Sequence, residues 1–383
     1  MRRPLILLLS ALLGLSMAVP AVAEPPDDVR FATYNASLNR FNQGDLLEDL
    51  QDVAAGDPVP QVDNVLAIIA RNDADVLLVN EFDFDPAAGE LFADLAGYEH
   101  HFIAPSNTGI PSGHDLNNDG VIGGPDDAFG FGFFPGQYGM LVLSDFPLPE
   151  ARTFQEVLWA DMPGARLPQL DGSPWFTDEE LEDVRLSSKS HWDVTVDVPG
   201  PKDVHLLASH PTPPVFDGPE DRNGLRNADE IRFWADYVHP AEGAWIVDDD
   251  DVAGGLEPGS RFVIAGDLNS DPVDGDSLPG AAQQLLDLPF VNTKLTPTSE
   301  GAVEQAILQG PPNVVATAQY DTADFAEPPG NLRADYVLPS RQLKLLDAAV
   351  DWPTTGDPDF AQVGTYPFPA SDHRLVWIDV RVN

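Results

Sequence analysis

Short apolar runs that end in an acidic, amide or imidazole side chain recur from one end of the sequence to the other. The clearest run, Arg261–Ala265, leads directly into Gly266–Pro272, which reads G-D-L-N-S-D-P. Such a run predicts a buried strand, and the flanking Gly and Pro predict a sharp turn at its end. The polar strand ends are Asn35, Glu81, His210, Asp267, Asn269, Asp335, Asp372 and His373. Because the pattern recurs on several strands, we expect these residues to meet at one site.

The order of the apolar runs predicts a mixed α/β fold. Val29–Asn35 predicts a first strand, Val62–Ala70 has the apolar spacing of a helix face, and Val76–Glu81 predicts a second strand. This order forms a right-handed parallel crossover. We expect further strands at 98–104, 139–144, 189–198, 204–210, 333–339 and 375–380, and helices at 226–237 and 281–288. Many strands and few helices favour two packed sheets with helices outside.

The first 23 residues have the features of a secretory signal peptide. Two arginines precede the Leu-rich run Leu5–Leu15, and the small residues Ala21 and Ala23 suit cleavage after position 23. The run is too short to span a membrane, and no later stretch is long enough, so we expect an exported protein, secreted or periplasmic, without a transmembrane segment. Residues 24–383 are expected to form a single domain, with a Gly-, Asp- and Pro-rich insertion at about 105–138.

The composition excludes several kinds of site. The chain has no cysteine, so disulfides, thiolate metal sites and a thiol nucleophile are excluded. Its 63 acidic and 20 basic residues give a formal net charge of −43. Such a charge repels polyanions and anionic membranes at long range, although metal ions and salt screen it near a cleft. A substrate that carries phosphate would therefore need local arginines or metal cations to offset this charge. We expect no stable nucleic-acid partner and a monomer.

Each polar strand end has a structural alternative when it is taken alone. Asp, Asn, Ser and Pro are ordinary turn residues, so Asp267 and Asn269 also suit a simple strand-to-turn junction. His210 could be a satisfied loop histidine, Glu81 the partner of an arginine, and Asp335 a structural ion-pair partner. Together, these residues offer what phosphate-ester hydrolysis needs: oxygen ligands for a hard cation, a carboxylate beside the nucleophile, and donors for developing negative charge.

The motifs also carry a family resemblance. In chain order they are T-Y-N at Asn35, N-E-F at Glu81, Q-Y-G-M-L-V-L-S around Tyr138 to Ser144, S-H-P at His210, G-D-L-N-S-D-P at Asp267 and Asn269, R-A-D-Y-V at Asp335, and S-D-H at Asp372 and His373. The sequence resembles a secreted bacterial member of the endonuclease/exonuclease/phosphatase superfamily of metal-dependent phosphoesterases. The resemblance covers nearly all of the chain after residue 23. It implies a four-layer α/β sandwich of the DNase I type, in which two packed mixed β-sheets are flanked by helices.

The resemblance implies a metal side and a nucleophile side. Glu81 would be the main ligand of Mg²⁺ or Mn²⁺, with Asn35 nearby and Asp372 on the metal side. Asp267 would orient or deprotonate the attacking water, with help from Asn269.

The resemblance also implies a group that contacts the phosphate. His373 would hydrogen-bond the phosphoryl oxygen that becomes charged, and Asp335 would orient that imidazole. His210 would contact the phosphate or assist the leaving group.

The sequence departs from the family pattern around its basic residues. Many members carry a basic residue after the strand that ends at Ser144, where this chain has Asp145. A phosphate clamp beside His210 could instead come from three arginines, Arg222, Arg226 and Arg232. The alternative is that Arg226 and Arg232 pair with acidic side chains on one helix surface.

A second cation site is predicted in the insertion, where residues 115–126 match the pattern of a calcium-binding loop. Asp115, Asn117, Asp119 and Asp126 supply oxygen side chains, Val121 would give its carbonyl, and a glycine occupies the sharp turn. No helices flank the loop, so it resembles an isolated, dockerin-like Ca²⁺ loop with a structural role. The alternative is a flexible Asp/Asn/Gly turn.

The expected function is that of a secreted divalent-metal-dependent phosphoesterase. It would hydrolyse a phosphate mono- or diester by water attack, as a phosphatase or phosphodiesterase acting on a small or lipid phosphate. Two alternatives stay open: an extracellular nuclease of the same superfamily, and a non-catalytic calcium-stabilised binding module on this scaffold. The net charge argues against the nuclease, and the intact set of polar strand ends argues against the binding module.

Overall fold

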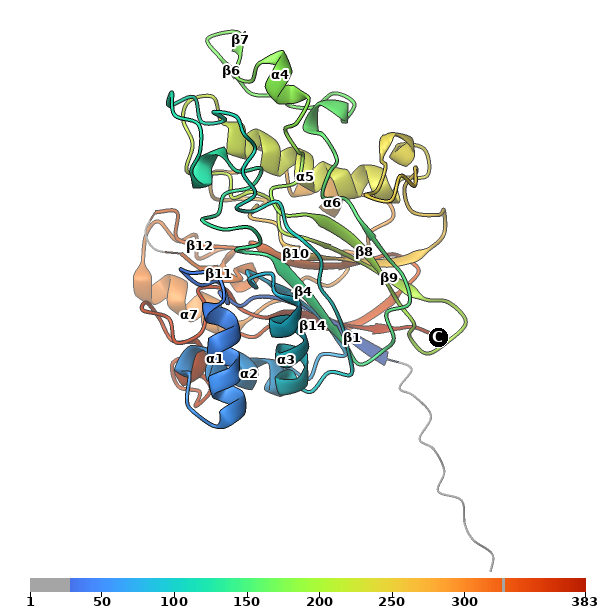
Figure 1. The fold of residues 1–383 in the computed structure, drawn as a ribbon. Coiled ribbons are helices and arrows are strands. Elements are labelled where there is room, and N and C mark those ends of the chain that lie inside the picture. The colour runs from blue at the N-terminus through green and yellow to red at the C-terminus, as the bar shows by residue number, and fades with distance from the viewer. Residues whose placement is uncertain (1–27, 326–327) are drawn as a thin grey trace, which may run out of the picture.

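Two β-sheets packed face to face form the centre of the computed structural model, which describes residues 28–325 and 328–383 (Figure 1). The first sheet has the strand order β14 (Lys344–Val350), β15 (Val376–Arg381), β1 (Asp28–Asn35), β2 (Val76–Asn80), β4 (Met140–Ser144) and β3 (His100–Phe102). The second has the order β13 (Asp335–Pro339), β10 (Arg261–Asp267), β9 (Val204–Ser209), β8 (His191–Val196) and β5 (Ala151–Thr153). The predicted signal peptide lies outside the described residues.

Helices cover the outer faces of both sheets. Helices α1 (Asp45–Ala55), α2 (Pro60–Asn72) and α3 (Pro86–Ala96) pack on the first sheet, and α5 (Arg222–Val238) and α6 (Gln283–Leu286) pack on the second (Figure 1). The predicted four-layer α/β sandwich is therefore confirmed. No helix in the described part of the chain combines the length and the apolar character needed to cross a membrane.

The remaining elements are short and lie in the connections. They are α4 (Asp178–Leu181), α7 (Glu300–Gln309), α8 (Phe360–Val363), the strand pairs β6 (Gln169–Leu170) with β7 (Ser173–Pro174) and β11 (Ala323–Asp324) with β12 (Asn331–Leu332), and the 3₁₀ helices η1 (Pro125–Asp127), η2 (Trp159–Asp161), η3 (Gly243–Trp245) and η4 (Ala318–Tyr320).

Three apolar layers hold the sandwich together, and each follows from the alternation of side chains along the strands. Between the sheets, side chains such as Phe31 and Leu78 of the first sheet and Trp192 and Val263 of the second form one buried cluster. Their neighbours along each strand point outward and pack against the helices. The long apolar runs in the sequence are therefore strands that are buried on both faces.

The strand order brings the polar strand ends to one edge of the sandwich. β1 pairs in parallel with β2, as predicted, and the last residues of both strands, Asn35 and Asn80, lie opposite each other. β9 pairs in parallel with β10, and the end of β10 lies opposite the start of β13, where Asp267 faces Asp335. Carboxyl ends of parallel strands share an edge, so the scattered motifs meet there.

The structure differs from the sequence prediction in several elements. Helix α5 begins at Arg222 rather than Arg226, and α3, α7 and β14 were not predicted. Two of the missed helices carry a start signal: the side chain of Asp85 accepts hydrogen bonds at the start of α3, and that of Ser299 does so at the start of α7.

Candidate active site

The buried carboxylate of Asp267 lies at the centre of the site, with 1% of the residue exposed. Asn35 donates a hydrogen bond from Nδ2 to Asp267 Oδ2 at 3.1 Å, and the backbone N–H of Asn269 donates to Oδ1 at 2.9 Å. Two histidines face the same Oδ2 atom, with His210 Nε2 at 3.4 Å and His373 Nε2 at 3.6 Å. The structure therefore brings together five of the predicted strand-end residues.

The surroundings of Asp267 keep its carboxylate ionised. Burial alone would raise its pKa, but the charge of His373 and the hydrogen bond of His210 hold that pKa well below its usual range. An ionised carboxylate in a buried site can accept a proton or a hydrogen bond from a water molecule.

The imidazole of His373 is held between two carboxylates. Its Nδ1 lies 2.8 Å from Asp335 Oδ2, and that same oxygen accepts a hydrogen bond from Thr322 Oγ1 at 2.7 Å. Burial lowers the pKa of His373, but the attraction of Asp335 and Asp267 outweighs it and raises the pKa well above its ordinary value. The protonated ring can donate a hydrogen bond to negative oxygen.

Glu81 forms the second half of the site, directly after β2. Its backbone has a φ of 58°, a conformation that non-glycine residues rarely adopt and that is frequent at functional sites. Asn35 donates a hydrogen bond to Glu81 Oε1 at 3.1 Å, and Asn39 donates to Oε2 at 2.6 Å. Asn35 therefore bridges the carboxylates of Glu81 and Asp267. Both Glu81 and Asp372 line the same cavity.

The donor atoms on the Glu81 side fit a hard divalent cation. Carboxylate and amide oxygens of Glu81, Asn35 and Asp372 are the ligand types that Mg²⁺ prefers. Asp267, Asp335 and His373 also place potential ligand atoms within 4.8 Å of one another. There the hydrogen bonding favours a proton over an ion, because both nitrogens of the imidazole already face a carboxylate.

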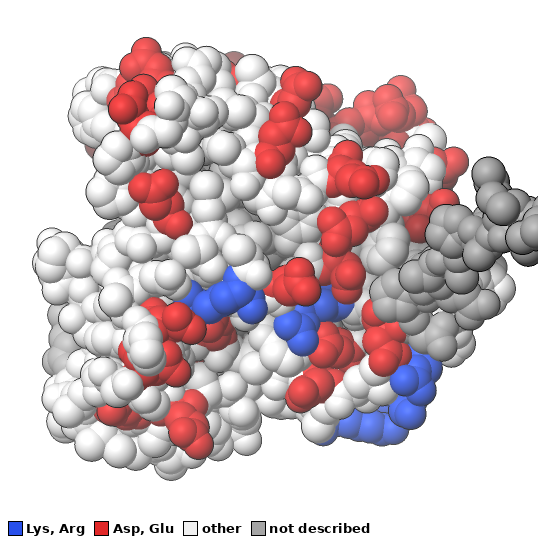
Figure 2. Space-filling model, turned by 90° about the horizontal axis from the view of Figure 1, so that it is seen from below, with Lys and Arg blue, Asp and Glu red and all other residues white. Residues whose placement is uncertain are grey.

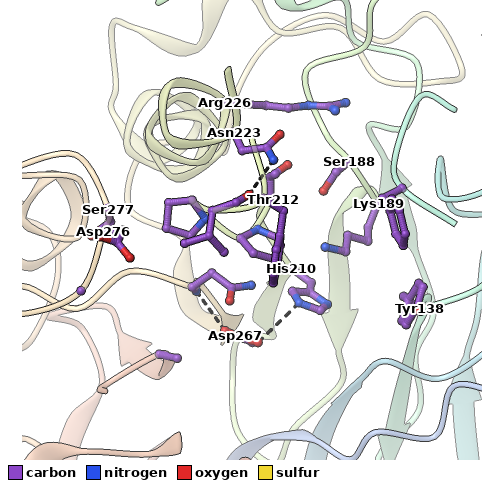
Figure 3. A pocket seen from close by; sticks show the side chains of 18 of the residues that line it. Tyr138, Ser188, Lys189, His210, Thr212, Asn223, Arg226, Asp267, Asp276 and Ser277 are labelled. Carbon is purple, nitrogen blue, oxygen red and sulfur yellow. Dashed lines mark hydrogen bonds and ion pairs between the residues drawn. The ribbon is translucent and has the colours of Figure 1, made fainter. Parts of the chain in front are cut away.

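A cavity of about 830 Å³ opens over these residues, and Lys189 is an unpredicted part of its lining. Only 6% of this lysine is exposed, and its side chain points into the cavity beside His210 (Figure 3). Within the described residues, its ammonium has no hydrogen-bond or ion-pair partner. Burial lowers the pKa of Lys189, an effect that the attraction of Glu230 and Glu81 opposes. The sequence signal was a lysine at the start of an alternating strand in a chain with few lysines.

His210 completes the polar floor as a neutral ring. Burial lowers its pKa, and the positive charge of Lys189 lowers it further. Its Nδ1 atom is buried without a hydrogen-bond partner among the described residues. Asn269 holds the neighbouring loop with a hydrogen bond from Nδ2 to the carbonyl of Pro211 at 3.1 Å. His210 lines the cavity, so a phosphate bound there would lie beside its ring.

The three predicted phosphate-binding arginines occupy different places. Arg222 and Arg226 line the cavity, but Arg222 donates a hydrogen bond to Glu220 at 2.6 Å, and Arg226 donates to three backbone carbonyls. Arg232 does not line the cavity. It donates to the carbonyls of residues 163 and 164 and lies 3.8 Å from Asp229. The contacts of Arg232 therefore match the alternative prediction, in which this arginine pairs with acidic side chains of its own helix.

The predicted calcium loop is only partly gathered. The carboxylate of Asp115 accepts hydrogen bonds from two backbone N–H groups of the loop, and Asn117 donates to Asp119 at 3.3 Å. Asp126 instead lines the large cavity. The neighbouring Asp127 is buried, and its carboxylate accepts hydrogen bonds from loop N–H groups at both ends. Asp127 therefore holds the loop closed from within.

Comparisons with known proteins place these features in a family. The model of the endonuclease/exonuclease/phosphatase family matches residues 32–373. A structure described as endonuclease/exonuclease/phosphatase from Beutenbergia cavernae DSM 12333 is 18% identical with a TM-score of 0.52, and the match covers 92% of this chain and 71% of that one. Sphingomyelinase C from Streptomyces griseocarneus is 15% identical with a TM-score of 0.45, covering 92% and 99%. At such identities the likeness concerns the fold alone. No curated protein matches the chain.

Proposed function

The chain belongs to the endonuclease/exonuclease/phosphatase family, and from this premise we propose that it is a divalent-metal-dependent phosphoesterase that hydrolyses a phosphate mono- or diester. One observation carries the proposal. The ionised carboxylate of Asp267 lies between His210 and His373 on the floor of a cavity, and Asn35 links it to Glu81. A carboxylate for the nucleophile, a cationic donor and oxygen ligands thus share one space.

In the proposed reaction, Asp267 positions a water molecule and accepts its proton as the water attacks phosphorus. The N–H of Asn269 and the amide of Asn35 fix the carboxylate, so its orientation is set before the substrate binds. A divalent cation held by Glu81, Asn35 and Asp372 would neutralise charge on the phosphate and the leaving oxygen.

The remaining cavity residues stabilise the charge that develops on the phosphoryl oxygens. The protonated His373 donates a hydrogen bond to one of these oxygens, and Asp335 keeps its ring in place. The ammonium of Lys189 faces the same space and forms a charge-assisted hydrogen bond when the phosphate arrives. The P–O bond to the alcohol then breaks, the leaving alkoxide takes up a proton from solvent, and Asp267 releases to solvent the proton that it took from the attacking water.

A small or lipid phosphate suits this protein better than a polynucleotide. The formal net charge is −43, and on the face shown in Figure 2 the basic side chains form small groups beside acidic ones rather than a continuous stripe. A duplex-binding surface needs such a stripe to neutralise phosphates. The experiment described next includes DNA as a substrate and so also tests the alternative of an extracellular nuclease.

The decisive experiment measures hydrolysis of mono- and bis-(p-nitrophenyl) phosphate and of DNA with Mg²⁺, with Mn²⁺ and after addition of EDTA. We expect metal-dependent turnover of a small ester that Asp267→Asn reduces by about 10³-fold or more, with the fold retained by circular dichroism. Asp57→Asn, in the exposed loop after α1, is the matched control and should leave the rate unchanged. Turnover of DNA alone would support the nuclease, and turnover of none of the three would support the binding module.

A further inference from the structure

An apolar wall extends the catalytic cavity beyond its polar floor. Its side chains include Phe129, Trp159, Phe176, Val184, Val215 and Leu332. They come from the insertion, the segment before β8, the loop before α5 and the strand β12 near β13. A phosphate group needs only the polar end, whereas about 830 Å³ lies within the range of pockets that enclose a whole small ligand. The apolar part is therefore available to the rest of the substrate.

Exposed aromatic rings mark the rim of the same cavity. Phe131 and Phe216 both belong to its lining, and they are 48% and 87% exposed. Phe133 packs edge-on against Phe131 at 5.6 Å between ring centres, and Phe41 lies 6.1 Å from Phe133. A contiguous exposed apolar group beside a cavity is unfavourable in water and is typical of a surface that contacts an apolar ligand.

Two polar side chains of α5 that line the cavity are already engaged within the protein. Arg226 donates hydrogen bonds to the carbonyls of Phe129, Arg185 and Leu186. Asn223 donates from Nδ2 to the carbonyl of Val215 at 2.7 Å. Figure 3 shows these two side chains on α5 above the polar floor. A nucleobase or sugar placed there would bury its own polar groups against apolar carbon at a cost, whereas a hydrocarbon chain has none to satisfy.

We infer that the substrate is a lipid phosphate, an ester whose alcohol carries a long hydrocarbon chain. The hydrocarbon chain of the substrate lies along the apolar wall, and its phosphate lies between Lys189, His210 and His373. This inference rests on the proposed function and names the substrate class for the same site. Hydrolysis needs only water: its oxygen bonds to phosphorus, the P–O bond to the alcohol breaks, and the alcohol takes up a proton.

The test uses methyl-, hexyl- and decylphosphonate as inhibitors of the hydrolysis of a short chromogenic ester, at concentrations below micelle formation. Full burial of one methylene corresponds to roughly a fourfold change in affinity. We expect the inhibition constant to fall at least about tenfold from methyl- to hexylphosphonate, and further for decylphosphonate. An inhibition constant independent of chain length would overturn the inference, as would stronger inhibition by thymidine 5′-phosphonate than by decylphosphonate.

A pair of valine variants locates the chain. Val215→Trp fills part of the wall, and we expect it to reduce the methyl-to-decyl ratio of inhibition constants at least about tenfold. Val252→Trp places the same ring on an exposed valine outside the cavity lining and should keep the wild-type ratio. Equal ratios in both variants would contradict the assignment. Absence of any turnover of the short ester by the wild type would instead refute the proposed function. Failure of the lipid-phosphate inference can therefore be distinguished from failure of the proposed function.

Discussion

Substitution of Lys189 by methionine should change activity and stability in opposite directions. The side chain is 6% exposed and its ammonium faces the cavity, so Met fills the same space without the charge. A charge-assisted hydrogen bond to a phosphate oxygen contributes about 1.5–3 kcal/mol, so its loss should lower kcat/KM by about 10- to 150-fold. Removal of a buried cation without a partner should stabilise the fold by about 1–3 kcal/mol.

Both effects can be measured on the same sample. Steady-state hydrolysis of p-nitrophenyl phosphate esters gives kcat/KM, and thermal unfolding gives Tm, which should rise by roughly 1–2 °C per kcal/mol for a domain of this size. Lys202→Met is the matched control, since Lys202 is exposed beyond the end of β8, and neither quantity should change. A variant that loses stability together with activity would refute the reasoning, because it would mean that Lys189 holds the fold rather than the phosphate.

Three further predictions follow from individual side chains. Asp335→Asn removes the main attraction that raises the pKa of His373, so we expect kcat/KM to fall about 10- to 100-fold and the alkaline limb of the pH–rate profile to move to lower pH; an unmoved limb would count against the role of Asp335. Asp321 is 3% exposed, and burial beside Asp271 raises its pKa to about 8. Its folded pKa is higher than its unfolded one, so stability should fall from pH 4 to pH 8, by up to about 4 kcal/mol at pH 7, and urea unfolding of Asp321→Asn should lose that slope. If residues 115–126 bind Ca²⁺, millimolar Ca²⁺ should raise Tm in the wild type and not in Asp119→Ala, and equal shifts in both would remove the calcium site.

The sequence predicted the strand ends of the site well because a buried parallel strand must be an apolar run and must stop at its sheet edge. Asn35, Glu81, Asp267 and His373 each follow or precede such a run, and the structure gathers them. The residues that the sequence missed act through burial rather than through a motif. Lys189 stands at the start of an alternating strand in a chain with few lysines, but only the packing around it shows that its charge lacks a partner among the described residues.

The long-range partners of arginines could not be read from sequence spacing. Arg226 has acidic neighbours on its own helix, yet its guanidinium donates to carbonyls of the segments 129 and 185–186, which fold over the helix. Asp126 matches the last position of a calcium loop, yet the next residue, Asp127, turns inward. Whether Asp126 or Asp127 turns inward depends on the backbone geometry of a Gly- and Pro-rich loop, and residue types alone do not determine that geometry.

The central claim is that Asp267 and His373 act on the same phosphate in the same step, and a double-mutant cycle on kcat/KM tests it most directly. We predict that Asp267→Asn and His373→Gln each lower kcat/KM by about 10³-fold or more. The kcat/KM of the double variant should be less than about tenfold below that of the less active single variant. Losses that multiply in the double variant, or single variants that keep near-wild-type rates, would contradict the account.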